Sequence, residues 1–173
     1  MSKKKMYLLT LVFLMLTASL LSACNYNSDV TDGDEKVTPE MDQVISDYIV
    51  QKYKTGYGET DKQFEVHKIY GTSGSGDTLD VYMWSYYGGF NKSHGTKAQS
   101  GHSLPALVRL EKKDGHYMVT KYKEPEDGSL YQSSIKKMFP EKYVKKAADD
   151  SGNMGGLEKK MNKKVENWMR KNG

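Results

Sequence analysis

Four histidines are the residues of this 173-residue chain best suited to metal binding or acid–base catalysis. They are His67, His94, His102 and His116. They form no His-Glu-x-x-His pair and no pair at i, i+4 spacing on a predicted helix, the spacings that zinc enzymes use. His94 and His102 flank one polar segment, and with Asp77 they are conceivable metal ligands, but solvated loop histidines are the simpler interpretation. The sequence therefore predicts no metal site and no cofactor.

The same polar segment, residues 91–103, also places serines beside histidines. Ser93 precedes His94, and Ser103 follows His102. Adjacent residues of an extended segment point to opposite faces, so neither pair is placed for proton transfer. The chain also lacks a Gly-x-Ser-x-Gly elbow. We therefore predict no catalytic residues, and we keep a small envelope hydrolase that uses residues 91–103 as an alternative.

Residues 71–77 contain the spacing Gly-x-x-Gly-x-Gly, which superficially matches a phosphate-binding loop. Such loops lead into the N-terminus of a helix, where free backbone N–H groups receive the anion. Here the pattern follows one predicted strand and leads into another. It therefore predicts a flexible or tightly turned loop between two strands.

Cys24 is the only cysteine, and it ends the run Leu21-Ser22-Ala23-Cys24. A lysine cluster at residues 3–5 and an apolar run at residues 6–21 precede it, which are the parts of an export signal. The apolar run is shorter than the ~20 residues that span a membrane. The four residues resemble the lipobox of bacterial lipoproteins, and the resemblance implies loss of residues 1–23 and lipidation of Cys24 by acyl chains such as palmitate. An ordinary cleaved signal that leaves one free thiol is the alternative.

The charge of +4 depends on the predicted signal segment. Without residues 1–23 the chain has 23 basic and 22 acidic residues, so the electrostatic argument for a nucleic-acid partner disappears. The charge is uneven along the chain, with −6 over residues 25–47 and +6 over residues 128–173. We expect residues 24–37 to be a disordered acidic tether that holds a folded domain away from the membrane surface.

The remaining pattern predicts an α+β domain over residues 38–150 and a basic amphipathic helix over residues 151–173. Thr38-Pro39-Glu40 begins a helix that ends near Lys54. The predicted strands span residues 64–70, 79–87, 103–111 and 117–123, with Gly88-Gly89 ending the second and Asp114-Gly115 turning the last hairpin. Short helices follow at residues 130–138 and 141–148. This order indicates an antiparallel sheet covered by helices, as in cystatin-like or NTF2-like layouts.

Three aromatic residues share one face of the second predicted strand. Tyr82, Trp84 and Tyr86 alternate with Leu79, Val81 and Met83 on the other face, so the aromatic side is a candidate binding surface. The other interpretation is core packing beneath the last helix. That helix carries the apolar stripe Leu157, Met161, Val165 and Trp168.

Several short motifs carry a further resemblance. The run from Leu104 to Leu110, Asp114-Gly115, Glu124-Pro125 with Asp127-Gly128, and Phe139-Pro140 are similar to the extracytoplasmic tail of some β-lactam-sensor-like antirepressor peptidases of Bacillus relatives. The similarity covers residues 64–140 and implies an accessory or sensory domain outside the membrane. It carries over no catalytic residue, since the zinc motif and the membrane helices of those peptidases are absent here.

These observations predict a non-enzymatic lipoprotein on the extracytoplasmic face of the cell membrane, held there by lipid on Cys24. Its domain would bind or sense a ligand, or serve as an accessory to a membrane protein. A structural or inhibitory partner of a membrane protein is a further alternative.

Overall fold

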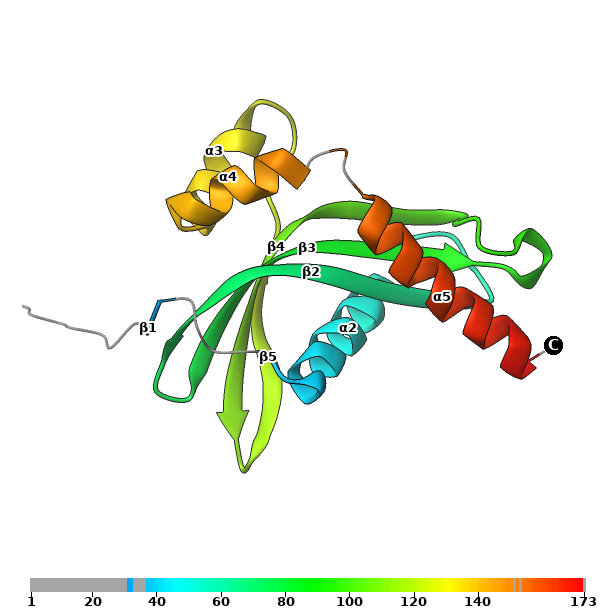
Figure 1. The fold of residues 1–173 in the computed structure, drawn as a ribbon, viewed down its shortest axis with the longest axis horizontal. Coiled ribbons are helices and arrows are strands. Elements are labelled where there is room, and N and C mark those ends of the chain that lie inside the picture. The colour runs from blue at the N-terminus through cyan, green and yellow to red at the C-terminus, as the bar shows by residue number, and fades with distance from the viewer. Residues whose placement is uncertain (1–30, 33–36, 151, 153, 173) are drawn as a thin grey trace, which may run out of the picture.

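The computed structural model describes residues 31–32, 37–150, 152 and 154–172, and its core is one antiparallel sheet in which neighbours in sequence are neighbours in space (Figure 1). The four long strands are β2 (Lys62–Ser75), β3 (Thr78–Phe90), β4 (Ser100–Lys113) and β5 (His116–Lys123). A short strand, β1 (Thr31–Asp32), pairs with Ser73 and Gly74 at one end of β2. With helices before and after the sheet, the predicted α+β class is confirmed. The signal segment 1–23 and Cys24 lie outside the described residues.

The helix before the sheet begins as its sequence predicts. In α2 (Pro39–Tyr53) the backbone N–H of Met41 donates to the Thr38 hydroxyl at 3.3 Å, and Pro39 occupies the first helical position. The last hairpin also matches its prediction. Asp114 and Gly115 have φ values of 51° and 85°, the left-handed conformation that a tight two-residue turn requires.

Strands β2 and β3 are longer than predicted, and two glycine segments predicted outside the strands lie inside them. Gly71 to Ser75 continue β2 after a bulge between Ile69 and Gly71, so the predicted loop shrinks to a tight turn at Gly76 and Asp77. Gly88 and Gly89 pair with Phe64 and Gln63 instead of ending β3. Ladder hydrogen bonds override the weak strand preference of glycine in both segments.

The predicted tether also differs in part from the structure. Thr31 and Asp32 pair with the end of β2 as strand β1, and Val37 packs against the apolar cluster beneath α2. Residues 24–30 and 33–36 of the predicted tether lie outside the described residues.

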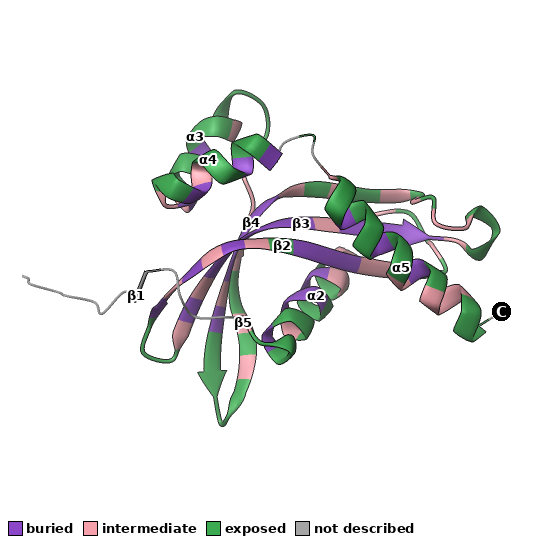
Figure 2. Ribbon diagram, in the orientation of Figure 1, coloured by how far each residue is buried: buried purple, intermediate pink, exposed green. Residues whose placement is uncertain are grey.

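Helices cover both faces of the sheet (Figures 1 and 2). On one face, Ile45 and Ile49 of α2 are fully buried with Val81, Met83 and Val108 of the sheet. The other face is covered by α3 (Tyr131–Met138), α4 (Glu141–Asp150) and α5 (Gly155–Asn172). The helix predicted as a separate basic segment therefore belongs to the same core as the sheet.

The aromatic side of β3 faces this second group of helices. Tyr82 and Trp84 are only 7% and 5% exposed, and Tyr86 is partly buried. They lie in one apolar cluster with Tyr143 of α4 and with Leu157, Met161 and Val165 of α5. Most of the candidate binding surface is therefore a packed layer, because the apolar stripe of α5 packs against the aromatic side of β3.

Candidate functional site

The two histidine–serine pairs of residues 91–103 are not brought together into one site. His94 lies in a short 3-10 helix (Lys92–His94), where its Nδ1 is 3.0 Å from the hydroxyl of the exposed Ser93. The prediction that these two neighbours point apart is therefore wrong, because the segment is helical here and not extended. His102 points into a tyrosine cluster, with Nδ1 2.9 Å from the Tyr57 hydroxyl. Ser103, on the other face of β4, accepts a hydrogen bond from Trp84 Nε1. The described residues hold no group of three metal ligands, and Asp77 lies in the β2–β3 turn.

His102 is enclosed by aromatic rings. Its ring stacks on Tyr87 at 5.4 Å between centroids and meets the edge of Tyr53 at 4.5 Å. Burial lowers the pKa of His102 below its ordinary value. A neutral imidazole packed among tyrosines favours a role in the core over a role as ligand or catalyst.

Titratable groups do converge beneath α2, around His67 and two carboxylates that no sequence motif indicated. The Glu65 carboxylate is 1% exposed and accepts hydrogen bonds from Ser46 Oγ at 2.7 Å and Ser85 Oγ at 2.8 Å. His67 Nδ1 lies 3.1 Å from Glu65 Oε2, and its Nε2 lies 3.1 Å from Asp42 Oδ1. One imidazole thus sits between two carboxylates at the junction of α2 and β2.

This group has the residue types of a catalytic triad but not the required protonation state. Burial alone lowers the pKa of His67, but the adjacent Asp42 and Glu65 carboxylates outweigh burial and raise that pKa to about 9. The pKa of Asp42 is lowered, chiefly by its hydrogen bond to His67. A protonated imidazole cannot act as a general base near neutral pH, and both serines donate to Glu65. The group therefore fastens α2 to β2.

The outer edge of β2 lies directly beside this group. From residue 62 to residue 69, β2 pairs with β3 on one side and with no strand of the described chain on the other. Helices α2 and α5 lie against opposite faces of β2, so the edge runs between them (Figure 1). An edge of this kind presents backbone groups that can pair with another chain.

Lysine side chains lie over the carbonyl groups of this edge. Three of them each donate a hydrogen bond to a backbone oxygen of β2: Lys164 to Glu65 at 2.9 Å, Lys160 to His67 at 3.5 Å, and Lys146 to Tyr70 at 3.4 Å. Lys160 and Lys146 are exposed and Lys164 is half-buried. Because these amines come from the surface of α4 and α5, they can leave the edge without disturbing the core.

Two adjoining hollows of about 440 Å³ and 340 Å³ follow the edge and form one groove. Ser46, Lys164 and Asn167 line both hollows. We call this the β2 groove. It carries five lysines, which are Lys62, Lys160, Lys163, Lys164 and Lys171. Its exposed acids are Asp42 and Asp47, and Asp42 is already paired with His67. The groove is therefore positively charged.

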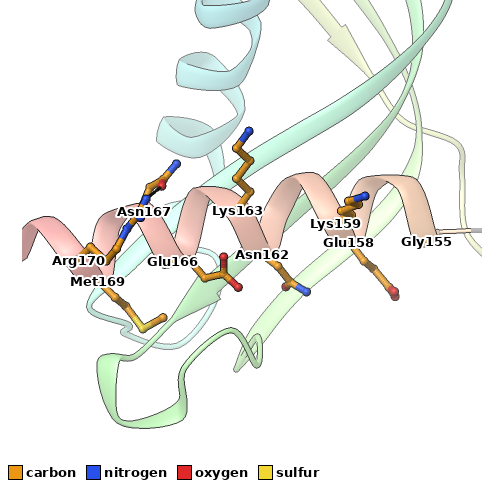
Figure 3. A pocket seen from close by; sticks show the side chains of 9 residues that line it. All are labelled: Gly155, Glu158, Lys159, Asn162, Lys163, Glu166, Asn167, Met169 and Arg170. Atoms are coloured by element: carbon orange, nitrogen blue, oxygen red, sulfur yellow. Dashed lines mark hydrogen bonds between the residues drawn. The ribbon is translucent and has the colours of Figure 1, made fainter.

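A larger hollow lies along α5, but it is not enclosed. All nine of its lining residues belong to α5 and none to the sheet (Figure 3). In this view Asn167 and Lys163 point to one side of the helix, and Asn162 and Glu166 point to the other. It is a solvated helix surface, which leaves the β2 groove as the better candidate site.

Comparisons with known proteins found no relative of this chain: no known protein family, no curated protein and no solved structure matches it. No helix in the described part of the chain is long and apolar enough to cross a membrane.

The strand pattern carried no signal that Glu65 and His67 are buried. Glu65 and His67 share one face of β2 with Ile69, and Phe64 and Val66 share the other, so alternation alone would turn the polar pair toward solvent. Asp42 and Ser46 are four residues apart on α2, hence on one side of the helix.

Proposed function

We propose that this chain is a lipid-anchored extracytoplasmic domain that binds an extended acidic segment of a membrane protein along the outer edge of β2. The anchor would be Cys24, since two acyl chains suffice for stable attachment. The resemblance of residues 64–140 to an accessory or sensory module outside the membrane supports the same assignment.

The observation that carries the proposal is the row of lysine-capped carbonyls on β2. Extended peptides bind exposed sheet edges by adding a strand, with main-chain hydrogen bonds supplying much of the affinity. The N–H groups of such a peptide would replace the amines of Lys160 and Lys164 at the carbonyls of His67 and Glu65. The released ammonium groups would then pair with carboxylates of the peptide.

The charge and shape of the β2 groove select the partner. Five lysines favour a segment rich in Asp or Glu over a neutral or basic one. Helices α2 and α5 flank the edge, so the groove has room for one extended chain. The rigid Asp42–His67–Glu65 group keeps this edge at a fixed position relative to α2.

The same lysines have a simpler use, the protection of a free edge against aggregation. The two functions differ in whether an acidic strand binds.

A photocrosslinking experiment distinguishes them. Photoreactive benzoylphenylalanine replaces Asn167, which lines the β2 groove, and in a control variant it replaces Asn162, which points to the other side of α5 (Figure 3). The probes are an acetylated and amidated Glu-Val octapeptide and its Lys-Val counterpart.

We expect crosslinking of the Glu-Val peptide at position 167, little at position 162, and little of the Lys-Val peptide at either position. Equal crosslinking at both positions, or none at 167 in a folded variant, would show that the lysines only protect the edge.

A further inference from the structure

A third hollow, of about 280 Å³, lies between the sheet, the end of α4 and the first turns of α5. Its lining residues are Lys68, Trp84, Asp150, Met154, Gly156, Leu157 and Lys160. We call it the Trp84 pocket. Lys160 lines both this pocket and the β2 groove, so the two are neighbours with separate floors.

The floor of the Trp84 pocket is apolar. The indole N–H of Trp84 donates to Ser103 Oγ at 2.7 Å, and Ser103 Oγ donates to Met154 Sδ at 3.1 Å. The polar atom of the indole is thus satisfied within the protein. Trp84, Met154 and Leu157 therefore offer carbon and sulfur surface to an occupant, which favours a ligand with an apolar body.

The charged groups at the pocket favour an anionic head group. Lys68 Nζ lies 2.8 Å and 2.7 Å from the two carboxylate oxygens of Asp150, so that acid is already neutralised. Within the described residues, Lys160 Nζ makes one long hydrogen bond of 3.5 Å, to the His67 carbonyl. Lys160 is thus the charge at this pocket without a close partner, and a carboxylate is the matching group.

The volume sets the size of the ligand. At about 280 Å³ the pocket is just below the range typical of drug-sized molecules, and it suits a single amino-acid residue. We propose that the Trp84 pocket binds a small carboxylate with an apolar body, such as an aromatic amino-acid residue with a free carboxylate. A free N-acyl amino acid and the C-terminus of a peptide share this chemistry. The proposal does not depend on strand addition at β2.

Two adjacent glycines provide a matched pair of variants. Gly156 lines the Trp84 pocket, whereas Gly155 lines the outer surface of α5. A Cβ at either position meets nothing within 4 Å, and leucine has a higher helix propensity than glycine. Gly156→Leu should therefore fill the pocket without unfolding the chain, and Gly155→Leu should leave the pocket open.

The experiment uses the full chain in detergent, labelled with ¹⁵N at tryptophan. The sequence has two tryptophans, so two indole signals are expected, and Trp168→Phe assigns them. N-acetylphenylalanine should shift the Trp84 signal saturably with a Kd of about 1 mM or less, and its amide should bind at least about tenfold more weakly. Gly156→Leu should lose this binding, and Gly155→Leu should retain it.

The tripeptide acetyl-Ala-Ala-Phe distinguishes the two sources of the carboxylate, which are free N-acyl amino acids and peptide C-termini. Affinity equal to or above that of N-acetylphenylalanine assigns the pocket to peptide C-termini, and a loss of about tenfold or more assigns it to free acyl amino acids. The proposal is overturned by equal binding of acid and amide, by unchanged binding in a folded Gly156→Leu variant, or by no saturable shift up to about 10 mM.

Discussion

Lys164 contacts Glu65 through the backbone of β2, not through the charge of the glutamate. Lys164 Nζ donates to the carbonyl oxygen of Glu65 at 2.9 Å. The carboxylate of the same residue is buried beneath α2, where it accepts hydrogen bonds from Ser46 and Ser85. Glu65 therefore links the edge of the β2 groove to the packing of α2, and substitutions on either side test the two functions separately.

Removal of the buried carboxylate should be strongly destabilising. Glu65→Ala leaves the His67 imidazolium with one counter-charge and leaves two buried serines without their acceptor. We expect a loss of about 3–5 kcal/mol in the free energy of unfolding, measured by urea titration. The control Glu158→Ala alters an exposed residue and should change stability by less than about 0.5 kcal/mol. A loss below about 1 kcal/mol for Glu65→Ala would contradict this account of the buried group.

Stability should depend on pH through His67. Its pKa is raised from 6.5 to about 9 in the folded state, so its contribution is complete below pH 6.5 and is lost as the pH rises through 9. The contribution is about 3 kcal/mol at most. The lowered pKa of Asp42 works in the opposite direction, since that contribution exists above pH 3.8 and is lost in acid.

Urea titrations at a series of pH values test this assignment. The native chain should lose stability between pH 6.5 and about 9.5, and His67→Gln should lack most of that decline. A decline of the same size in both proteins would assign the pH dependence to other groups.

The lysines over the edge should matter more for solubility than for stability. Lys160→Ala combined with Lys164→Ala uncovers two carbonyls of β2 and should cost less than about 1 kcal/mol. Edge pairing between copies should then produce concentration-dependent oligomers in sedimentation velocity. Lys159→Ala with Arg170→Ala, which alters the outer surface of α5 by the same charge, should remain as monodisperse as the native chain. Identical sedimentation of the two double variants would contradict edge protection.

The lipid anchor predicts a simple change in cell fractionation. Cys24→Ala removes the only thiol and hence the site for the acyl chains. We expect the variant to move from the membrane fraction to the soluble extracytoplasmic fraction or the culture medium. Continued recovery with membranes at the native level would exclude Cys24 as the anchor.

The sequence was sufficient to predict the elements with strong local signals. Thr38-Pro39 marks the start of α2, Asp114-Gly115 marks a hairpin turn, and Phe139-Pro140 ends α3, since each depends on backbone preferences of one or two residues. Alternation along β3 also separated Val81 and Met83 from Tyr82 and Trp84 correctly. The continuation of β2 and β3 through glycines was not predictable, because it depends on the neighbouring strand.

The candidate site was less accessible to sequence reasoning. Glu65 and His67 could be placed on one face of a strand, but the burial of that face and its contacts with Asp42 and Ser46 depend on how α2 lies across the sheet. The β2 groove depends on which strand ends the sheet and on where α5 packs, and both are properties of the tertiary structure. Local periodicity carries no information on either.

Amide hydrogen exchange along β2 tests the central claim most directly. The carbonyls of Glu65 and His67 point away from β3 and accept hydrogen bonds from lysines. In an antiparallel sheet the N–H and C=O groups of one residue point to the same side of the strand, so the N–H groups of Glu65 and His67 also point outward. Addition of the Glu-Val octapeptide should slow exchange of these two amides by about tenfold or more, while those of Phe64 and Val66, which face β3, should change little. Unchanged exchange at Glu65 and His67 under saturating peptide would contradict strand addition at this edge.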